Sequence, residues 1–381
     1  MSFNNENRMT ERTVLVIFPS IYSLNKINNL KTNISKILRI KNQTFNKIRR
    51  NESVIIVEAT DPVLASSTVN LLFGIERIAI AKEVQSNFDS VLSTITSTAL
   101  SLLLKGERFF LKVDGKTEGF LAKDLEIAAT AALVEKGSTI QAKPGSEAVH
   151  DRLLYTFLTN SHSYICIFVD KGLGGIPYNF HKEKILCSIY DELSAISCLQ
   201  TIKMGFDVKI VVCYRNESDL LKLAKMINRI LPRMIQDKVI LHICKITSSS
   251  NLLTVITATT NIMIAIASKE KIKRIALAIS PIIFPLSFSE FNSDIVSRHK
   301  LASWFPLSGL DLGILENAKE IGLEKYISNL ENLCKRRYSN TTSNVDALKY
   351  AKNALKTLKC VSIRVGSKNI HDIIDSLKSD H

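Results

Sequence analysis

A glycine-rich crossing in the middle of the chain constrains the fold more than any other stretch. In KGLGGIPYNFHKEKILCSIYDELSA, residues 171–195, three glycines and a proline precede an apolar strand, and a helix is expected to open near Asp191. A strand that passes through a tight turn into a helix is where α/β folds bind phosphate groups, on N–H groups of the helix N-terminus. The sequence therefore predicts that a nucleotide-binding type of domain begins here.

Downstream of the crossing, apolar strand-like runs alternate with helices. The expected strands are 185–189, 208–214, 239–246 and 272–279, and the expected helices are 193–203, 220–230 and 252–268. This alternation predicts a doubly wound α/β domain, a parallel sheet with helices on both faces. We place it at residues 171–381.

Upstream of the crossing, the pattern is that of two smaller α+β modules. The expected elements of the first are strand 13–18, helix 30–41, strand 54–57, a helix from Asp61-Pro62 to Gly74, and strand 75–84. This order predicts a ferredoxin-like module at 13–86. The second module, 87–170, is expected to hold helix 88–104, strand 107–113, helix 123–135 and, after a poorly patterned stretch, strand 164–169.

Composition fits a folded protein without a membrane segment. The 381 residues, 46% of them hydrophobic, allow two or three packed domains. No uninterrupted run of apolar residues along the chain reaches the roughly 18–20 that a bilayer requires. The first twelve residues are polar and contain no apolar signal core. We therefore expect a cytoplasmic protein with a short disordered start.

The cysteines are expected to be reduced thiols. The chain has seven, and none forms a CxxC pair. Cys166, Cys187, Cys213 and Cys244 lie in apolar runs, which favours a role as small buried side chains over a disulfide or a zinc site. Cys360 opens an expected strand, 360–365, and is also expected to be buried. No metal site is predicted.

Basic residues are concentrated near the N-terminus. The formal net charge is +14, and residues 26–50 hold eight Lys or Arg and no acid. A charged outer helix face is usually only solvated surface, but charges of one sign that continue past the helix favour contact with phosphates. The candidate contacts in this region are Lys31, Lys36, Arg39, Lys41, Lys47, Arg49 and Arg50.

Two blocks carry a family resemblance. GLGGIP followed by an apolar strand and Ser188 resembles the junction of the tRNA 4-thiouridine synthetases, the tRNA sulfurtransferases also linked to thiamine biosynthesis. PLSGLDLGILENAKEIGLEKYI, residues 306–327, resembles the PLIGxDKxEIxxxAxxIGT segment of that family. The resemblance implies an ATP-pyrophosphatase domain and tRNA as a partner.

The second module resembles the RNA-binding THUMP domain of the same family. In that domain, a basic strand precedes a helix whose N-terminal end faces the RNA. The resemblance implies further RNA contacts at Arg108, Lys112, Lys116 and Lys123.

The chain departs from the family at the catalytic loop. The family pattern SGGxDS is replaced by a shorter loop in which Ile189 and Tyr190 stand in the glycine positions, between Ser188 and Asp191. Glycine adopts the backbone angles of a phosphate cradle more readily than these residues. Asp191 is interpreted either as the aspartate of the motif or as an ordinary helix N-cap. We therefore expect a degenerate nucleotide loop.

Cys334 is the candidate for sulfur handling, because family members carry a cysteine in this neighbourhood. Lys335, Arg336 and Arg337 follow it, and adjacent cations favour a thiolate. The interpretation as a surface cysteine beside phosphate-binding charges is preferred.

The sequence thus favours a tRNA-binding protein in which catalysis is absent or impaired, with no cofactor expected. One alternative is an active ATP-dependent tRNA uridine 4-sulfurtransferase with a divergent loop, which would use ATP and Mg²⁺. Another is a tRNA-binding scaffold for a separate modification enzyme. A cysteine desulfurase or another tRNA-modification subunit as a partner, and a homodimer, are left open.

Overall fold

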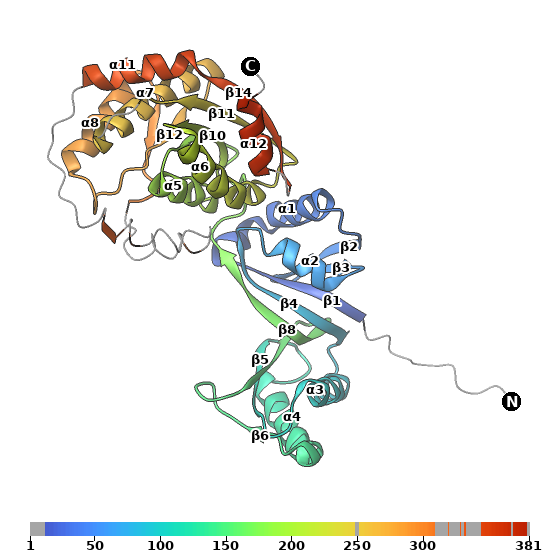
Figure 1. Ribbon diagram of the computed structural model, residues 1–381. Helices are drawn as coiled ribbons and strands as arrows, with labels where there is room; N and C mark the ends of the chain where they lie inside the picture. The colour runs from blue at the N-terminus through green and yellow to red at the C-terminus, as the bar shows by residue number, and fades with distance from the viewer. Residues whose placement is uncertain are drawn as a thin grey trace. The chain divides into compact units, whose positions relative to one another are not determined.

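The fold is described from a computed structural model of the chain. The structure describes residues 12–247, 251–308, 344–366 and 369–378, together with residues 319, 328, 331 and 332. The chain divides into two compact units, Met1–Gly174 and Gly175–His381 (Figure 1). The division falls within the glycine-rich crossing.

The first half of the N-terminal unit has the ferredoxin-like order of elements. They are β1 (Arg12–Pro19), the short 3-10 helix η1 (Ile21–Lys26), α1 (Ile27–Ile40), β2 (Phe45–Asn51), β3 (Val54–Ala59), α2 (Pro62–Val69) and β4 (Ile75–Gln85). The strands pair antiparallel in the order β2-β3-β1-β4. The Asp61 side chain caps α2 by accepting from the N–H groups of Val63 and Leu64, as predicted. α2 ends at Val69 rather than at Gly74, and β2 was not predicted.

The second half extends the same sheet. Its elements are α3 (Phe88–Leu102), β5 (Arg108–Gly115), α4 (Ala122–Lys136), η2 (Gly137–Ile140), β6 (Lys143–Pro144), β7 (Arg152–Leu158) and β8 (His162–Gly174). The order continues from β4 as β8-β7-β5-β6, which gives an eight-stranded sheet. β8 pairs with both β4 and β7, so one strand joins the two predicted modules.

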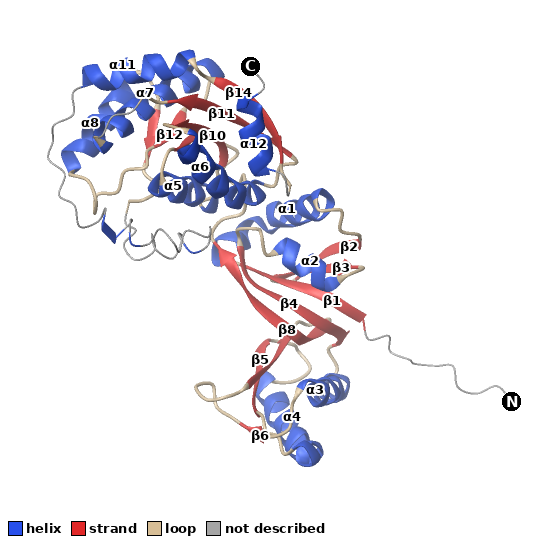
Figure 2. Ribbon diagram, viewed as in Figure 1, coloured by secondary structure: helices blue, strands red, loops and turns tan. Residues whose placement is uncertain are grey.

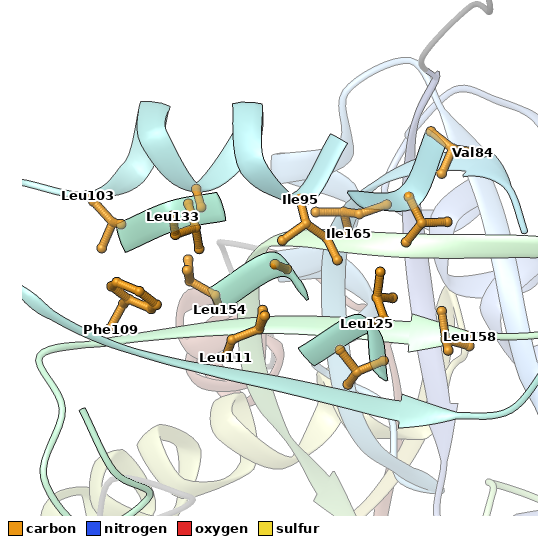
Figure 3. Packing of buried hydrophobic residues seen from close by; sticks show 14 of the residues in the cluster. Val84, Ile95, Leu103, Phe109, Leu111, Leu125, Leu133, Leu154, Leu158 and Ile165 are labelled. Atoms are coloured by element: carbon orange, nitrogen blue, oxygen red, sulfur yellow. The ribbon is translucent and has the colours of Figure 1, made fainter. Parts of the chain in front are cut away.

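A hydrophobic core packs α3 and α4 against this second half of the sheet (Figure 3). Ile95 of α3, Leu133 of α4 and Phe109 of β5 are each at most 1% exposed. Their shared core explains why a helix-strand-helix segment with weak sequence patterning folds at all.

The glycine crossing requires glycine for steric reasons. A Cβ on Gly172 would lie 2.4 Å from the carbonyl oxygen of Ile75 on the neighbouring strand. Gly175 has a φ of +73°, and a Cβ there would lie 2.7 Å from the carbonyl oxygen of Lys203. Any larger residue at either position would push apart paired backbone segments.

The C-terminal unit is the predicted doubly wound domain. Its elements are β9 (Lys184–Ile189), α5 (Glu192–Lys203), β10 (Asp207–Tyr214), α6 (Glu217–Ile230), η3 (Leu231–Met234), β11 (Lys238–Lys245), α7 (Leu252–Glu270), β12 (Arg274–Ala276), α8 (Leu286–Arg298), β13 (Ala302–Trp304), α11 (Asn344–Lys356), β14 (Lys359–Arg364) and α12 (Asn369–Lys378). The order β13-β12-β9-β10-β11-β14 is parallel except for β14, which pairs antiparallel with β11. Figure 2 shows helices on both sides of this sheet.

Among the helices that the structure describes, α7 alone is apolar and long enough to cross a membrane by length and composition. However, 72% of its apolar window is buried inside the domain. α7 packs against α11, α8 and the sheet, which is how the core helix of a doubly wound domain is placed.

We predict that Phe109→Ala will lower the free energy of unfolding by about 3–5 kcal/mol, because it removes a fully buried ring from the core of α3, α4 and β5. Urea unfolding followed by circular dichroism measures the effect. Leu104→Ala is the matched control, since Leu104 is 64% exposed in the same unit and should change the value by less than about 0.5 kcal/mol. Equal effects of the two substitutions would contradict this core.

Candidate functional site

The strand order of the C-terminal sheet indicates where a ligand would bind. The chain runs from β9 outward through β10 to β11, and then returns through α7 to β12 on the other side of β9. Open α/β sheets bind ligands at such a reversal of strand order, beside the carboxyl ends of the strands. The predicted nucleotide loop, Ser188 to Asp191, lies at the carboxyl end of β9 and therefore at this position.

The loop is closed by a reciprocal capping box. The N–H groups of Tyr190 and Asp191 both donate to Ser194 Oγ at 2.9 Å. The N–H group of Ser194 donates to Asp191 Oδ1 at 2.8 Å. Asp191 is thus the N-cap of α5, in agreement with the second interpretation of this residue. Three N–H groups at the start of the helix have partners within the loop itself.

The other loop side chains are buried. Ile189 is 0% exposed, Ser188 3% and Tyr190 5%. Burial raises the pKa of the Tyr190 hydroxyl well above its usual value, so the ring is neutral. On the other side of the point where the strand order reverses, the segment after β12 is also apolar, and its Leu277 and Ile279 are buried. Both segments that flank the reversal therefore carry apolar side chains.

A polar hollow of about 650 Å³ lies beside the start of α6. Arg215, Lys222 and Lys225 contribute its positive charges. Arg215 pairs with Asp219 through contacts of 3.2 Å, and Lys222 pairs with Glu192 of α5 at 2.5 Å. Most of the positive charge that lines the hollow is thus neutralised by carboxylates of the same unit. In the described residues, no three His, Cys, Asp or Glu side chains are placed to hold a metal ion.

The predicted RNA-binding residues separate into two groups. Arg108 pairs with Asp151, Lys112 with Glu147 and Lys123 with Glu126, and Arg49 is held by Glu83 and Glu58. Within the described ranges, no carboxylate lies at ion-pair distance from the remaining candidates. They are Lys31, Lys36, Arg39, Lys41, Lys47, Arg50 and Lys116.

We call these candidates without a carboxylate partner the uncommitted cations. They lie mainly on α1 and β2. α1 buries Leu30, Ile34, Ile37 and Leu38 as predicted, and Lys36 and Arg39 are exposed on its outer face. Lys47 and Arg50 are exposed on the edge strand β2. Arg50 Nε donates to the carbonyl oxygen of Glu52 at 2.7 Å.

One prediction about the cysteines was wrong. Cys166, Cys187, Cys213 and Cys244 are buried, as predicted, whereas Cys360 is exposed. The expected burial of Cys360 was wrong because β14 is an edge strand with alternating exposure rather than an interior strand. Cys334 lies outside the described residues. Sequence reasoning also missed β2 and the acidic partners of Arg49, because both depend on pairing between distant strands.

Comparison with known proteins supports the predicted relationship. No family model matches the chain. Over 194 residues it is 24% identical to a Methanosarcina mazei protein named "Probable tRNA sulfurtransferase". The match covers 50% of this chain and 46% of that protein, so the chain spans about half the length of the curated relative.

Two solved structures share the fold. The protein PH1313 from Pyrococcus horikoshii Ot3 superimposes with a TM-score of 0.62 and 18% identity, over 82% of this chain and 100% of its own. A 4-thiouridine synthetase crystallised in complex with RNA and bound ATP gives a TM-score of 0.68 and 16% identity, over 93% and 100%. The predicted fold class is therefore confirmed, and half of the chain is similar in sequence to a protein named as a probable tRNA sulfurtransferase.

The pKa of the Asp191 carboxyl, which caps α5, leads to a prediction about pH. Burial raises the pKa of Asp191 from 3.8 to about 6, although its bonds with Ser194 oppose the shift. A carboxyl whose folded pKa is raised stabilises the fold below its unfolded pKa and loses that contribution as pH rises through the folded value. Asp191→Asn keeps an acceptor for the cap and removes the charge.

We therefore expect the free energy of unfolding of the wild type to fall, relative to Asp191→Asn, by up to about 3 kcal/mol between pH 4 and pH 7. Trp304, the single tryptophan of the chain, lies in the C-terminal unit and reports its unfolding by fluorescence. Parallel pH curves for the two proteins would show that the carboxyl titrates normally.

Proposed function

We propose that this protein binds tRNA through its N-terminal unit and that its α/β unit lacks, or has impaired, adenylation activity. The assignment of 13–86 as a ferredoxin-like module, 87–170 as a THUMP-like domain and 171–381 as a degenerate ATP-pyrophosphatase-like domain is part of this proposal. We further propose that the protein acts in the cytoplasm.

Support for RNA binding comes from the group of uncommitted cations on α1 and β2. A cation already paired with a carboxylate must break that pair before it contacts a phosphate, whereas an uncommitted one releases only counterions. Lys36, Arg39 and Lys47 are exposed and have no acidic partner in the described part of the chain. The related 4-thiouridine synthetase was crystallised with RNA, which favours the same class of partner here.

The observation that carries the catalytic half of the proposal is the capping box at Asp191. A phosphate cradle needs N–H groups that point outward without partners. Here the N–H groups of Tyr190, Asp191 and Ser194 bond within the loop, and Ile189 and Tyr190 carry buried side chains. These residues do not fit the phosphates of ATP.

Two alternatives remain distinct from this proposal. An active sulfurtransferase with a divergent loop would transfer sulfur to tRNA uridine with ATP and Mg²⁺, and would form 4-thiouridine when given a sulfur donor. A scaffold would bind tRNA and also a separate modification enzyme or a cysteine desulfurase. The related proteins named for thiolation favour the first of these, and the closed loop speaks against it.

We predict that the double variant Lys36→Glu, Arg39→Glu will weaken tRNA binding at least tenfold at 0.1 M salt. Each phosphate contact that is lost should also reduce the log-log salt slope by roughly 0.7–0.9. Filter binding or fluorescence anisotropy with folded tRNA, over a salt series, measures both quantities.

The matched control is Lys349→Glu, Lys352→Glu on α11 of the C-terminal unit, which changes the net charge by the same amount. Arg49 is not a suitable target, because its removal leaves Glu83 and Glu58 without a shared cation. Equal loss of affinity in both double variants would mean that net charge alone drives binding and would contradict the assigned surface.

A further inference from the structure

We propose that Cys360, His242 and Glu270 form a nucleophilic thiol site that exchanges with sulfur–sulfur bonds. The three residues lie on β14, on β11 and at the end of α7, all within the C-terminal unit. The inference concerns a site separate from the nucleotide loop and does not depend on RNA binding.

Strand pairing brings the thiol to the imidazole. β14 runs antiparallel to β11, and Cys360 stands directly opposite His242 in the register. Cys360 Sγ lies 3.3 Å from His242 Nδ1. His242 Nε2 lies 2.9 Å from Glu270 Oε1, a charge contact rather than an aligned hydrogen bond. A carboxylate beside Nε2 favours the tautomer with its proton on that nitrogen, which leaves the lone pair of Nδ1 facing the thiol.

The order thiol, imidazole and carboxylate is the arrangement that activates cysteine nucleophiles. The imidazole accepts the proton of the thiol, and the carboxylate orients the ring and stabilises the imidazolium that forms. Lys209 of β10 also pairs with Glu270, which fixes the carboxylate from its other side. The three positions of the triad are therefore held by three separate elements.

The electrostatics suit this role. Burial lowers the pKa of His242 below its usual value, although Glu270 acts in the opposite direction, and Lys209 and Lys269 add to the lowering. The imidazole is therefore neutral near pH 7 and free to accept a proton. Burial alone would raise the pKa of Glu270, but its contacts with Lys209 and His242 hold that pKa below the usual value. The carboxylate is thus charged.

Exposure distinguishes Cys360 from the other described cysteines. Cys360 is exposed, whereas Cys166, Cys187, Cys198, Cys213 and Cys244 are buried. His242 is 3% exposed, so solvent reaches the thiol but not the base. A reactant can therefore approach the sulfur while the proton acceptor stays shielded.

The position of Cys360 favours one class of reaction. Acyl transfer requires N–H donors that stabilise an oxyanion, and a helix N-terminus commonly supplies them. Cys360 is instead the second residue of an edge strand. Attack on divalent sulfur forms no oxyanion and needs only a thiolate and a proton for the leaving group. Disulfides and persulfides share this chemistry.

The exchange step balances without a further reagent. His242 takes the thiol proton, and Cys360 Sγ attacks one sulfur of R–S–S–R′. A new S–S bond to Cys360 forms while the original S–S bond breaks, and the leaving thiolate R′–S⁻ takes the proton from the imidazolium. Cys360 is oxidised and the released sulfur is reduced. With a persulfide R–S–SH attacked at its outer sulfur, the products are a Cys360 persulfide and R–SH.

The test is residue-resolved thiol exchange in the full chain. Oxidised glutathione serves as the disulfide and glutathione persulfide as the persulfide, in separate arms. Samples are taken at a series of times, and an alkylating agent blocks the free thiols and stops the exchange. The modified Cys360 peptide is then quantified by mass spectrometry. The buried cysteines are internal controls for folding, because they become reactive only if the unit opens.

We predict that His242→Gln will slow modification of Cys360 at pH 7 at least tenfold, a smaller loss than the roughly hundredfold or more that general base catalysis typically contributes. Glu270→Gln should slow it less. In His242→Gln the rate should rise about tenfold per pH unit between pH 6 and pH 8, as for an isolated thiol, and the wild-type profile should be flatter. Reaction in one arm only would identify the class of substrate.

Equal rates and equal pH profiles in the wild type and both variants, with the buried cysteines unreactive, would overturn the proposal. If His242→Gln opens the fold, the comparison with Glu270→Gln decides: an unchanged rate and profile there overturns the proposal as well. None of the three residues belongs to the uncommitted cations of α1 and β2, so tRNA binding should be unchanged in these variants. Failure of this inference is therefore distinct from failure of the proposed function.

Discussion

The hydrogen bonds that join Ser194 to Tyr190 and Asp191 determine what the β9–α5 turn can do. They satisfy the N–H groups of Tyr190, Asp191 and Ser194 inside the protein, at the place where the strand order of the sheet reverses. The same bonds anchor the start of α5, whose residues are almost all buried. A turn that opened to hold a phosphate would lose this cap and expose Ile189 and Tyr190. Helix stability and nucleotide binding thus compete for the same N–H groups.

The N-terminal unit is governed by a different constraint, the continuity of its eight-stranded sheet. β8 pairs with β4 on one side and with β7 on the other, so the two modules share backbone hydrogen bonds. In this unit, carboxylates hold Arg49, Arg108, Lys112 and Lys123, whereas no carboxylate of the described residues pairs with the cations of α1 and the outer positions of β2. The distribution of acids, rather than the number of bases, therefore selects the surface that we assign to RNA.

Much of the fold could be predicted from local sequence, because its signals are local. The N-caps Asp61 and Asp191, the apolar face of α1 and the alternation after residue 185 all depend on neighbours along the chain. Features formed by distant pairing could not be predicted. β2 has few apolar residues and is held by its register with β3, Arg49 meets Glu83 across the sheet, and Cys360 meets His242 only because β14 returns beside β11. The candidate chemistry at Cys360 lies entirely in this second class.

We propose that the β9–α5 turn does not accept the phosphates of a nucleotide. Titration calorimetry of the full chain with ATP and Mg²⁺, in the presence and absence of tRNA, tests it most directly. We expect no saturable binding at micromolar ATP in either condition. Micromolar affinity, or release of pyrophosphate that depends on tRNA, would contradict this proposal and would support an active sulfurtransferase with a divergent loop.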